Sequence, residues 1–325
     1  MSDYTIYIDA LPEGDWFQSL SPQLKGAELV KLQSAEAPPV VKELTSYDRP
    51  DIILLRDGDP VLVLEKTGHV PTGKNPLQRV ARMVKAGEMG VTGVFFTPYE
   101  AMKHGTHSGK CNANYRLIES LRQIGEVHNV EMLIPPWPSD NEYELIRDGS
   151  EDGLVGEFVD QFFTNDCDPN VPAANKIRKR TEEEVERILN EHPPYKRPPR
   201  SVDITDTEDY LGRIRGKLDG RPPDPLPKRS ESVVCTFDMS PSSCRRVDPY
   251  GGAQFVYDYL YCRTGPSRSE RRRNLVLQIP RVPKETWLDK NPYKPQNKSS
   301  LWYKCADAIE LEDAVLTDFE QYRQS

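Results

Sequence analysis

The clearest hydrophobic pattern lies in residues 50–69, where two apolar runs flank a short polar segment. The runs cover Ile52–Leu55 and Val61–Leu64, and the segment RDGDP between them has the composition of a turn. Continuous apolar runs of this length are typical of strands that are covered on both faces. The pattern therefore predicts an antiparallel hairpin in the interior of a sheet.

The segments around this hairpin alternate between strand-like and helix-like patterns. A short strand is expected at YTIYI and an amphipathic stretch around 22–46. Helical spacing of apolar residues follows in PLQRVARMVKAGEMG, then a buried strand in VTGVFFTP, a helix at about 113–127 and a strand in VEMLIPPWP. One or two helices are expected within NEYELIRDG and GLVGEFVDQFF. This order predicts an α/β fold, with a mixed central β-sheet flanked by helices.

The amino-acid composition of the chain changes near residue 165. A proline-rich stretch at 166–231 surrounds one charged helix, TEEEVERILNEH, for which Thr181 is the expected cap. The segments SVVCTFDM, AQFVYDYLYCR and RNLVLQIP are then rich in β-branched and aromatic residues. We predict a core at 1–165, a helical arm or linker at 166–231 and a β-rich extension at 232–325. The pattern leaves open whether the extension is a separate domain or a further layer on the first sheet.

Two acidic residues stand at the open end of the predicted hairpin. An unbulged hairpin centred on Gly58 places Asp51 directly opposite Glu65, with Cβ atoms about 4.5–5.5 Å apart. Two carboxylates beside a dry apolar wall repel each other unless a positive charge lies between them, and a hard divalent ion such as Mg²⁺ suits such a pair. The alternative is structural: Asp51 caps a strand after Pro50, and Glu65 is a surface residue.

Composition and charge narrow the classes of function. The net charge of −8 over 325 residues counts against indiscriminate binding of nucleic acid, although arginine clusters in the C-terminal half could contact phosphates. No apolar run reaches the roughly 18–20 residues that span a bilayer, and MSDYTIYIDALPEGDW lacks a secretory pattern. We therefore expect a cytoplasmic protein with no membrane segment. Phosphate-binding GxxxxGK[ST], dinucleotide-binding GxGxxG and esterase GxSxG motifs are missing from the sequence.

Pro50, Asp51 and Glu65, followed by helix, strand, helix and strand, resemble the PD-(D/E)XK nuclease superfamily, which includes many type II restriction endonucleases. The resemblance covers roughly residues 20–165. It implies a restriction-endonuclease-like core that hydrolyses phosphodiester bonds in double-stranded DNA with Mg²⁺ or Mn²⁺. Asp51, Glu65 and the carbonyl group of Lys66 would hold the metal, and a homodimer would present one site to each DNA strand.

The chain departs from this family at one position. Where the family has a lysine two residues after the acid, this sequence has Thr67. Lys66 points to the opposite face of a regular strand and does not simply take over the role. Three explanations remain open: Thr67 binds a metal-bound water, His69 or Lys74 replaces the lysine, or the site is inactive.

Further side chains are candidates for the site and for DNA contacts. Gln78, Arg79 and Arg82 open the next helix and either reach the metal pocket and the scissile phosphate or lie on the surface. Glu43 is a weaker candidate for an additional acid. Contacts to DNA are expected from the loop at 240–254 and from a later basic cluster, through Arg245, Arg246, Arg271, Arg272 and Arg273.

Three functions fit these observations. The first is a type II restriction endonuclease. The second is a catalytically silent nuclease-fold module that binds nucleic acid or protein, with the missing lysine as its mark. The third is a nuclease subunit of an antiviral defence system that cuts without sequence preference.

Overall fold

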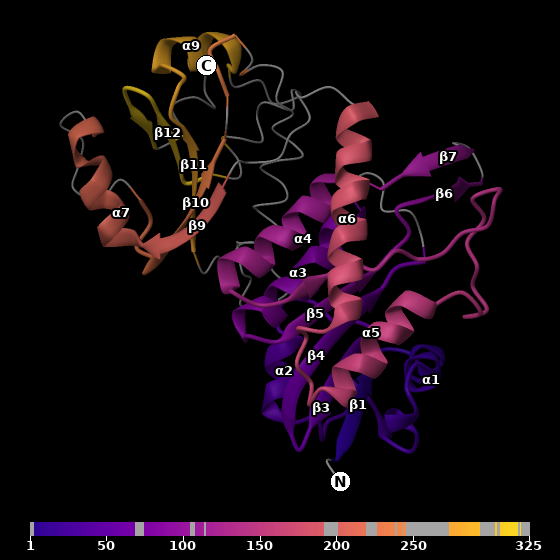
Figure 1. Cartoon of the computed structure of the whole chain (residues 1–325). Coiled ribbons are helices and arrows are strands. Elements are labelled where there is room, and N and C mark those ends of the chain that lie inside the picture. Colours follow the sequence, from indigo (N-terminus) through magenta and orange to yellow (C-terminus); the bar gives the residue numbers. More distant parts are fainter. Residues whose placement is uncertain are drawn as a thin grey trace. The chain divides into compact units, whose positions relative to one another are not determined.

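The computed structural model describes residues 3–68, 75–104, 108–113, 115–191, 201–218, 226–237, 239–242, 244, 273–292, 303, 306–317 and 319. The chain divides into two compact units, Met1–Glu191 and His192–Ser325. Each has its own sheet with flanking helices (Figure 1). The predicted α/β class, with mixed sheets between helices, is confirmed.

The sheet of the first unit has six strands in the order β2-β1-β3-β4-β5-β8. Strand β3 runs antiparallel to both of its neighbours, and the other neighbouring pairs are parallel. The strands are β1 (Tyr4–Ile8), β2 (Glu28–Lys31), β3 (Ile52–Arg56), β4 (Asp59–Lys66), β5 (Thr92–Phe96) and β8 (Met132–Leu133). Strands β6 (Glu100–Lys103) and β7 (Gly109–Asn112) form a separate antiparallel pair. The predicted hairpin, β3 and β4, lies at the centre of the six-stranded sheet.

Helices cover this sheet on both faces. On one face, Ile52, Leu54, Leu62 and Leu64 pack in one cluster with residues of α5 (Gly153–Thr164) and α6 (Pro172–Glu191). Side chains alternate along a strand, so Ile53, Val63 and Glu65 point to the other face, where α3 (Asn75–Glu88) packs on β4, β5 and α4 (Tyr115–His128). The other helices among the described residues of this unit are α1 (Leu11–Ser19), η1 (Pro22–Leu24) and α2 (Pro39–Leu44).

The structure refines two local predictions in the first unit and contradicts a third. The stretch at 22–46 contains η1, β2 and α2. Of the one or two helices expected within NEYELIRDG and GLVGEFVDQFF, the structure has α5, and NEYELIRDG forms turns and a bridge. Thr181 is not a helix cap: α6 begins at Pro172, and the Thr181 hydroxyl donates to the carbonyl of Ile177 at 2.9 Å. The helix starts early because Ala173, Ala174 and Ile177 form a buried face before the charged segment.

The second unit has a five-stranded sheet in the order β13-β12-β11-β10-β9. Its outer pairs are antiparallel and its inner pairs are parallel. Its described elements are β9 (Ser201–Asp206), α7 (Thr207–Ile214), η3 (Arg215–Lys217), β10 (Glu231–Thr236), β11 (Asn274–Ile279), α9 (Lys284–Lys290), β12 (Ala308–Leu311) and β13 (Val315–Leu316).

This second sheet divides the predicted arm at 166–231 between the two units. Helix α6 belongs to the first unit, whereas β9 and α7 belong to the second. The carboxylate of Asp206 caps α7 by accepting hydrogen bonds from the amides of Glu208 and Asp209 at 2.8 and 3.3 Å. Residues of AQFVYDYLYCR lie outside the described part of the chain. The C-terminal region is therefore an α/β unit of its own, and it begins earlier than the predicted extension.

Candidate functional site

The hairpin that carries the acidic pair contains a β-bulge, which was not predicted from the sequence. Its turn has two residues, Asp57 and Gly58, both with positive φ (51° and 92°). The register shifts by one residue between Leu54 and Leu55, so that Ile52 pairs with Leu64. The predicted unbulged ladder is wrong, but at the open end of the hairpin the bulge restores the predicted pairing. Continuing the register by one pair sets Asp51 opposite Glu65.

Both carboxylates are buried and converge on one arginine. Glu65 is 0% exposed and Asp51 is 6% exposed. Nη1 of Arg82 donates to Oε2 of Glu65 at 2.6 Å and lies 3.5 Å from Oδ1 of Asp51. The other oxygen of Asp51, Oδ2, accepts a hydrogen bond from the main-chain amide of Lys66 at 2.6 Å. The amide thus orients Asp51 so that its second oxygen faces the same positive centre as Glu65.

Arg82 reaches this position from α3, and a third acid holds it there. Its Nε lies 3.2 Å from Oδ2 of Asp48, while its side chain is 20% exposed. Burial by itself lowers the pKa of Arg82, but the charge of Glu65, the hydrogen bond to it and the charges of Asp48 and Asp51 raise that pKa above its usual value. The guanidinium is therefore firmly charged and offsets the repulsion between the two buried carboxylates.

One turn further along α3, Lys85 repeats this arrangement. Its buried ammonium group pairs with Glu43 and lies 3.7 Å from Oε2 of Glu88. The hydroxyl of Tyr47 donates to the same Glu88 oxygen at 2.6 Å. Glu43, considered as an additional acid, thus faces Lys85. Arg82 and Lys85 thus lie on one face of α3 and contact acidic residues that lie before the hairpin or at its start.

Neither Asp48 nor Lys85 was predicted from the sequence to lie near the acidic pair. Charged residues three or four positions apart on a helix more often lie on a solvated face. Lys85 lies between the apolar residues Val84 and Ala86, but successive helix residues point to different faces, so these neighbours did not predict that its side chain is buried.

Lys66 points to the opposite face of the sheet, as strand alternation predicts. Its Nζ lies 3.8 Å from the ring centroid of Trp16 and 4.9 Å from that of Trp137. Both rings stack on Phe96, with centroids 5.6 and 4.7 Å away. Burial lowers the pKa of Lys66, and the charges of Asp152, Glu13 and Asp51 oppose that shift. The ammonium group is held among aromatic rings, and the main-chain amide of Lys66 contacts Asp51 on the other face.

The other candidate residues near the pair are only partly described. Thr67 is 4% exposed, and its amide donates to the carbonyl of Phe96 at 2.9 Å, which extends the β4–β5 pairing by one residue. His69 and Lys74 lie outside the described residues. Gln78 and Arg79 belong to α3, but their side chains are not described. Gln78 lies one turn before Arg82 on the same helix face.

Among the arginines expected to contact DNA, the structure describes Arg82 and Arg273. Arg273 is 5% exposed, and its Nε contacts Oε2 of Glu231 at 2.8 Å. This contact links the beginnings of β10 and β11, so Arg273 has a structural role within the second unit. Arg245, Arg246, Arg271 and Arg272 lie outside the described residues.

The donor set of the acidic pair fits a small divalent cation. Mg²⁺ commonly binds through one or two carboxylates and keeps several of its waters. Asp51 and Glu65 already direct oxygens at one positively charged atom, Nη1 of Arg82. The residues that the structure describes contain no cluster of three or more acidic, histidine or cysteine side chains suited to a metal. A metal here would therefore depend on the carboxylate pair, on main-chain carbonyl groups and on water.

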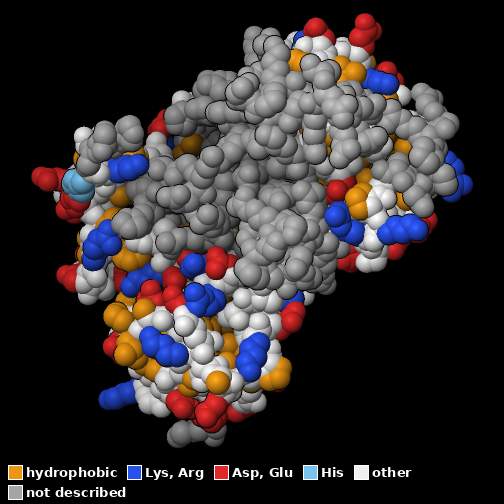
Figure 2. Space-filling view, turned by 180° about the vertical axis from the view of Figure 1, so that it is seen from behind, with side chains coloured by type: hydrophobic (Ala, Val, Ile, Leu, Met, Phe, Trp, Pro, Cys, Tyr) orange, Lys and Arg blue, Asp and Glu red, His pale blue; other side chains and the backbone are white. Residues whose placement is uncertain are grey.

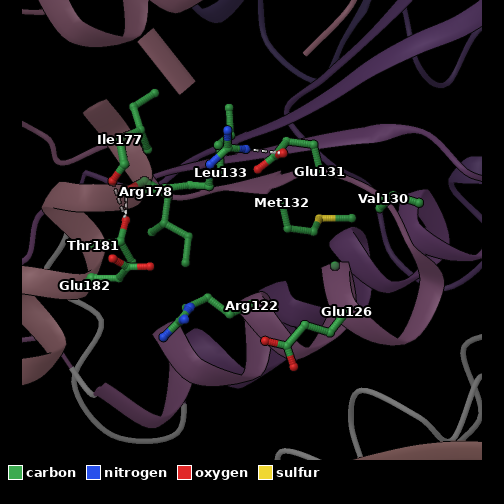
Figure 3. Close-up of a pocket in the computed structure, with 12 residues that line it drawn as sticks. Arg122, Glu126, Val130, Glu131, Met132, Leu133, Ile177, Arg178, Thr181 and Glu182 are labelled. Atoms are coloured by element: carbon green, nitrogen blue, oxygen red, sulfur yellow. Dashed lines mark hydrogen bonds and ion pairs between the residues drawn. The ribbon is translucent and has the colours of Figure 1, made fainter. Parts of the chain in front are cut away.

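A separate cavity opens between α4, β8 and α6 (Figure 3). It has a volume of about 270 Å³, and Arg122 and Glu126 of α4 line it together with Thr181 and Glu182 of α6. Arg178, also in its wall, forms an ion pair with Glu131. None of the residues around the acidic pair lines this cavity, so the two features are distinct.

The face drawn in Figure 2 carries charges of both signs. Lys and Arg side chains lie among Asp and Glu side chains on its described residues. Within the described residues, every helix is too short or too polar to pass through a bilayer.

Comparisons with models of known protein families, with curated proteins and with solved structures found no match. The geometry around Asp51, Glu65 and Arg82 is thus the basis on which a function can be proposed.

Proposed function

We propose that the protein is a metal-dependent DNA endonuclease that resembles type II restriction enzymes. One observation carries this proposal: two buried carboxylates, of Asp51 just before β3 and of Glu65 in the antiparallel neighbour β4, converge on a single positive centre. The pair lies where the resemblance to PD-(D/E)XK nucleases expects its metal ligands. The order of the elements that follow, β3-β4-α3-β5-β6-β7-α4-β8, in which β6 and β7 form a separate pair, supports the same proposal.

Asp51, Glu65 and the carbonyl group of Lys66 would hold Mg²⁺ or Mn²⁺. Such a metal supplies Lewis acidity and lowers the pKa of a bound water, both of which hydrolysis of a phosphodiester requires. The chain contributes orientation: the Lys66 amide holds Asp51, and the packed sheet around Glu65 keeps that carboxylate away from bulk water. Thr67, with His69, Lys74 or Gln78, would position the attacking water.

Double-stranded DNA is the proposed substrate, and a homodimer is the proposed assembly. A two-fold dimer would place one acidic pair at each strand of the duplex. Arg79 and the arginines at 245, 246, 271 and 272 are the proposed contacts to phosphates and bases. Sedimentation with and without a DNA duplex measures the assembly directly.

The function is tested by incubating the purified chain with plasmid and phage DNA in the presence of Mg²⁺. Asp51→Asn and Glu65→Gln should each lower the cleavage rate by at least about 100-fold, since each removes a ligand charge. Asp15→Asn and Glu186→Gln, at exposed positions of α1 and α6, are matched controls that should cut at the wild-type rate. Cleavage that is equal in all four variants would refute the proposal.

The pattern of products separates two kinds of nuclease. Discrete fragments indicate recognition of a site, as in a restriction enzyme. A smear indicates cutting without sequence preference, as expected for a subunit of an antiviral defence system.

A second candidate function is a catalytically silent nuclease-fold module that binds nucleic acid or protein. Two observations favour it: Thr67 stands where the family has lysine, and Arg82 supplies a positive charge to the acidic pair. Such a module would show no cleavage with Mg²⁺ or Mn²⁺, and neither ion would raise its unfolding temperature.

A further inference from the structure

Arg82 contacts both members of the acidic pair through one atom. Nη1 is within hydrogen-bond distance of Glu65 and lies at the limit of that distance from Asp51. Metal–oxygen distances for Mg²⁺ are about 2.0–2.1 Å. An ion bound by the same two oxygens would therefore compete for the space and the lone pairs that Nη1 uses. The guanidinium and the metal are alternative partners of the pair.

Asp48 gives Arg82 a second anchor outside the pair. It contacts Nε, at the base of the guanidinium, and its own side chain is 37% exposed. Rotation about the aliphatic bonds of the arginine side chain can carry the whole planar guanidinium away from Glu65 and toward Asp48, where its charge stays paired.

We propose that Arg82 is an exchangeable counter-ion: it neutralises Asp51 and Glu65 in the metal-free protein, and metal binding transfers its guanidinium to the substrate phosphate. The planar fork of an arginine matches the oxygens of a phosphate better than a lysine does. Arg82 would thus supply the positive charge that Thr67 does not. The transfer to phosphate rests on the proposed nuclease function, whereas the exchange with metal does not.

The exchange predicts opposite effects of one substitution on metal binding and on cutting. We would titrate Arg82→Gln and Arg82→Ala with Mn²⁺ in a calorimeter, without DNA, and follow the unfolding temperature. Removing the competing charge-assisted hydrogen bond should tighten Mn²⁺ binding by about tenfold or more. It should also enlarge the rise in unfolding temperature that Mn²⁺ causes. At saturating Mn²⁺, the cleavage rate of both variants should fall by at least about 100-fold.

Control variants distinguish the exchange of Arg82 with the metal from the transfer of its guanidinium to phosphate. Arg122→Ala, on α4 beside Glu119, removes an ion-paired arginine that is more exposed than Arg82 (36% against 20%) and should leave Mn²⁺ affinity and cutting unchanged. Arg82→Lys retains a charge and should bind Mn²⁺ with an affinity between those of the wild type and Arg82→Gln. If Arg82→Ala folds only when Mn²⁺ is added, that result supports the exchange. The affinity for Mn²⁺ is then measured with Arg82→Gln.

Unchanged or weaker Mn²⁺ binding by Arg82→Gln would overturn the inference, even if the wild type cuts DNA. Tighter binding by this variant, combined with a wild type that cuts no DNA, would uphold the exchange and reject the nuclease function. Full cleavage by Arg82→Gln at saturating Mn²⁺ would reject the transfer to phosphate.

Discussion

At the scale of single residues, the site is governed by how buried charge is compensated. Glu65 is 0% exposed, and a carboxylate in such a place is costly unless a cation and hydrogen bonds accompany it. Arg82 provides both. Removing one member of such a pair leaves the other uncompensated, so the two sides of this contact depend on each other.

Glu65→Gln should therefore lower stability as well as activity. Arg82 would keep Asp48 and Asp51 but lose its shortest contact, and we expect a loss of about 1–3 kcal/mol in the free energy of unfolding. Urea denaturation at neutral pH measures it. Glu186→Gln on α6 should change this free energy by less than about 0.5 kcal/mol. An equal loss in both variants would argue against a compensated pair.

The main chain and the side chain of Lys66 have different roles, and a substitution of the side chain tests them separately. Lys66→Met keeps an unbranched apolar side chain beside Trp16 and Trp137, and it keeps the amide that orients Asp51. We expect a loss of about 1 kcal/mol from the cation–π contacts and an unchanged rate of DNA cleavage. A hundredfold fall in cleavage without loss of structure would show instead that the ammonium group takes part in the reaction.

At the scale of elements, the hairpin depends on its turn and its bulge. Each register step in a strand exchanges the two faces, so one bulge decides whether Glu65 or Leu64 lies opposite Asp51. The turn sets the starting point of that register. Gly58 has φ = 92°, and a Cβ added there would meet nothing within 4 Å. The cost of a side chain at this position is thus purely a cost of backbone conformation.

Gly58→Ala should lower the free energy of unfolding by about 1 kcal/mol. The acidic pair lies roughly 20 Å away along the strands. The variant should therefore retain the wild-type increase in unfolding temperature with Mn²⁺, measured by differential scanning calorimetry. Loss of the Mn²⁺ effect in a folded variant would mean that the turn alters the register at the site.

Helix α6 is fastened to the end of the sheet by buried hydroxyl groups. The Tyr99 hydroxyl donates to the carbonyl of Ile134 and lies 2.8 Å from Oγ1 of Thr181. Burial is the largest cause of a raised Tyr99 pKa. The folded chain keeps this proton at pH values where the unfolded chain, with a tyrosine pKa near 10, has lost it. The contribution of Tyr99 to stability is thus complete below pH 10 and falls as the pH rises further.

Tyr99→Phe should show a crossing pH dependence. At pH 8 the variant should be less stable by about 1 kcal/mol, because the carbonyl of Ile134 loses a donor. Between pH 10 and 12 its stability should fall less steeply than that of the wild type. Urea denaturation at a series of pH values measures both slopes, and parallel slopes would show that Tyr99 ionises normally in the folded chain.

At the scale of the whole molecule, the chain has two units with separate sheets and cores. Asp51, Glu65, Arg82 and Lys66 all belong to Met1–Glu191. The core of the second unit includes Tyr210, Val234 and Val276, which come from elements of that unit alone. The site and the segments proposed to contact DNA, at 240–254 and 271–272, thus belong to different units.

Residues 1–191 expressed alone should fold and should bind Mn²⁺ as tightly as the full chain. Their affinity for DNA should be at least about tenfold weaker if the second unit contributes phosphate contacts. Circular dichroism, calorimetry and fluorescence anisotropy with a labelled duplex measure these three properties. Equal affinity for DNA would remove the second unit from the proposed interface.

The sequence by itself determined what depends on local periodicity. Two apolar runs around Asp57-Gly58 were enough to predict the hairpin, and strand alternation was enough to place Glu65 and Lys66 on opposite faces. The pairing of Asp51 with Glu65 was also predicted, although through an unbulged ladder that the structure does not have. The mixed α/β class followed from the order of the elements.

Only the tertiary structure decided the partners of these residues. Arg82 could face solvent or the acidic pair on helix spacing alone, and the packing of α3 on β4 and β5 chose the pair. Trp16 and Trp137 meet Lys66 from distant parts of the chain, and the early start of α6 depends on a face buried against the sheet. Periodicity describes which side of an element is apolar, but contacts between elements form only when the sheet brings them together.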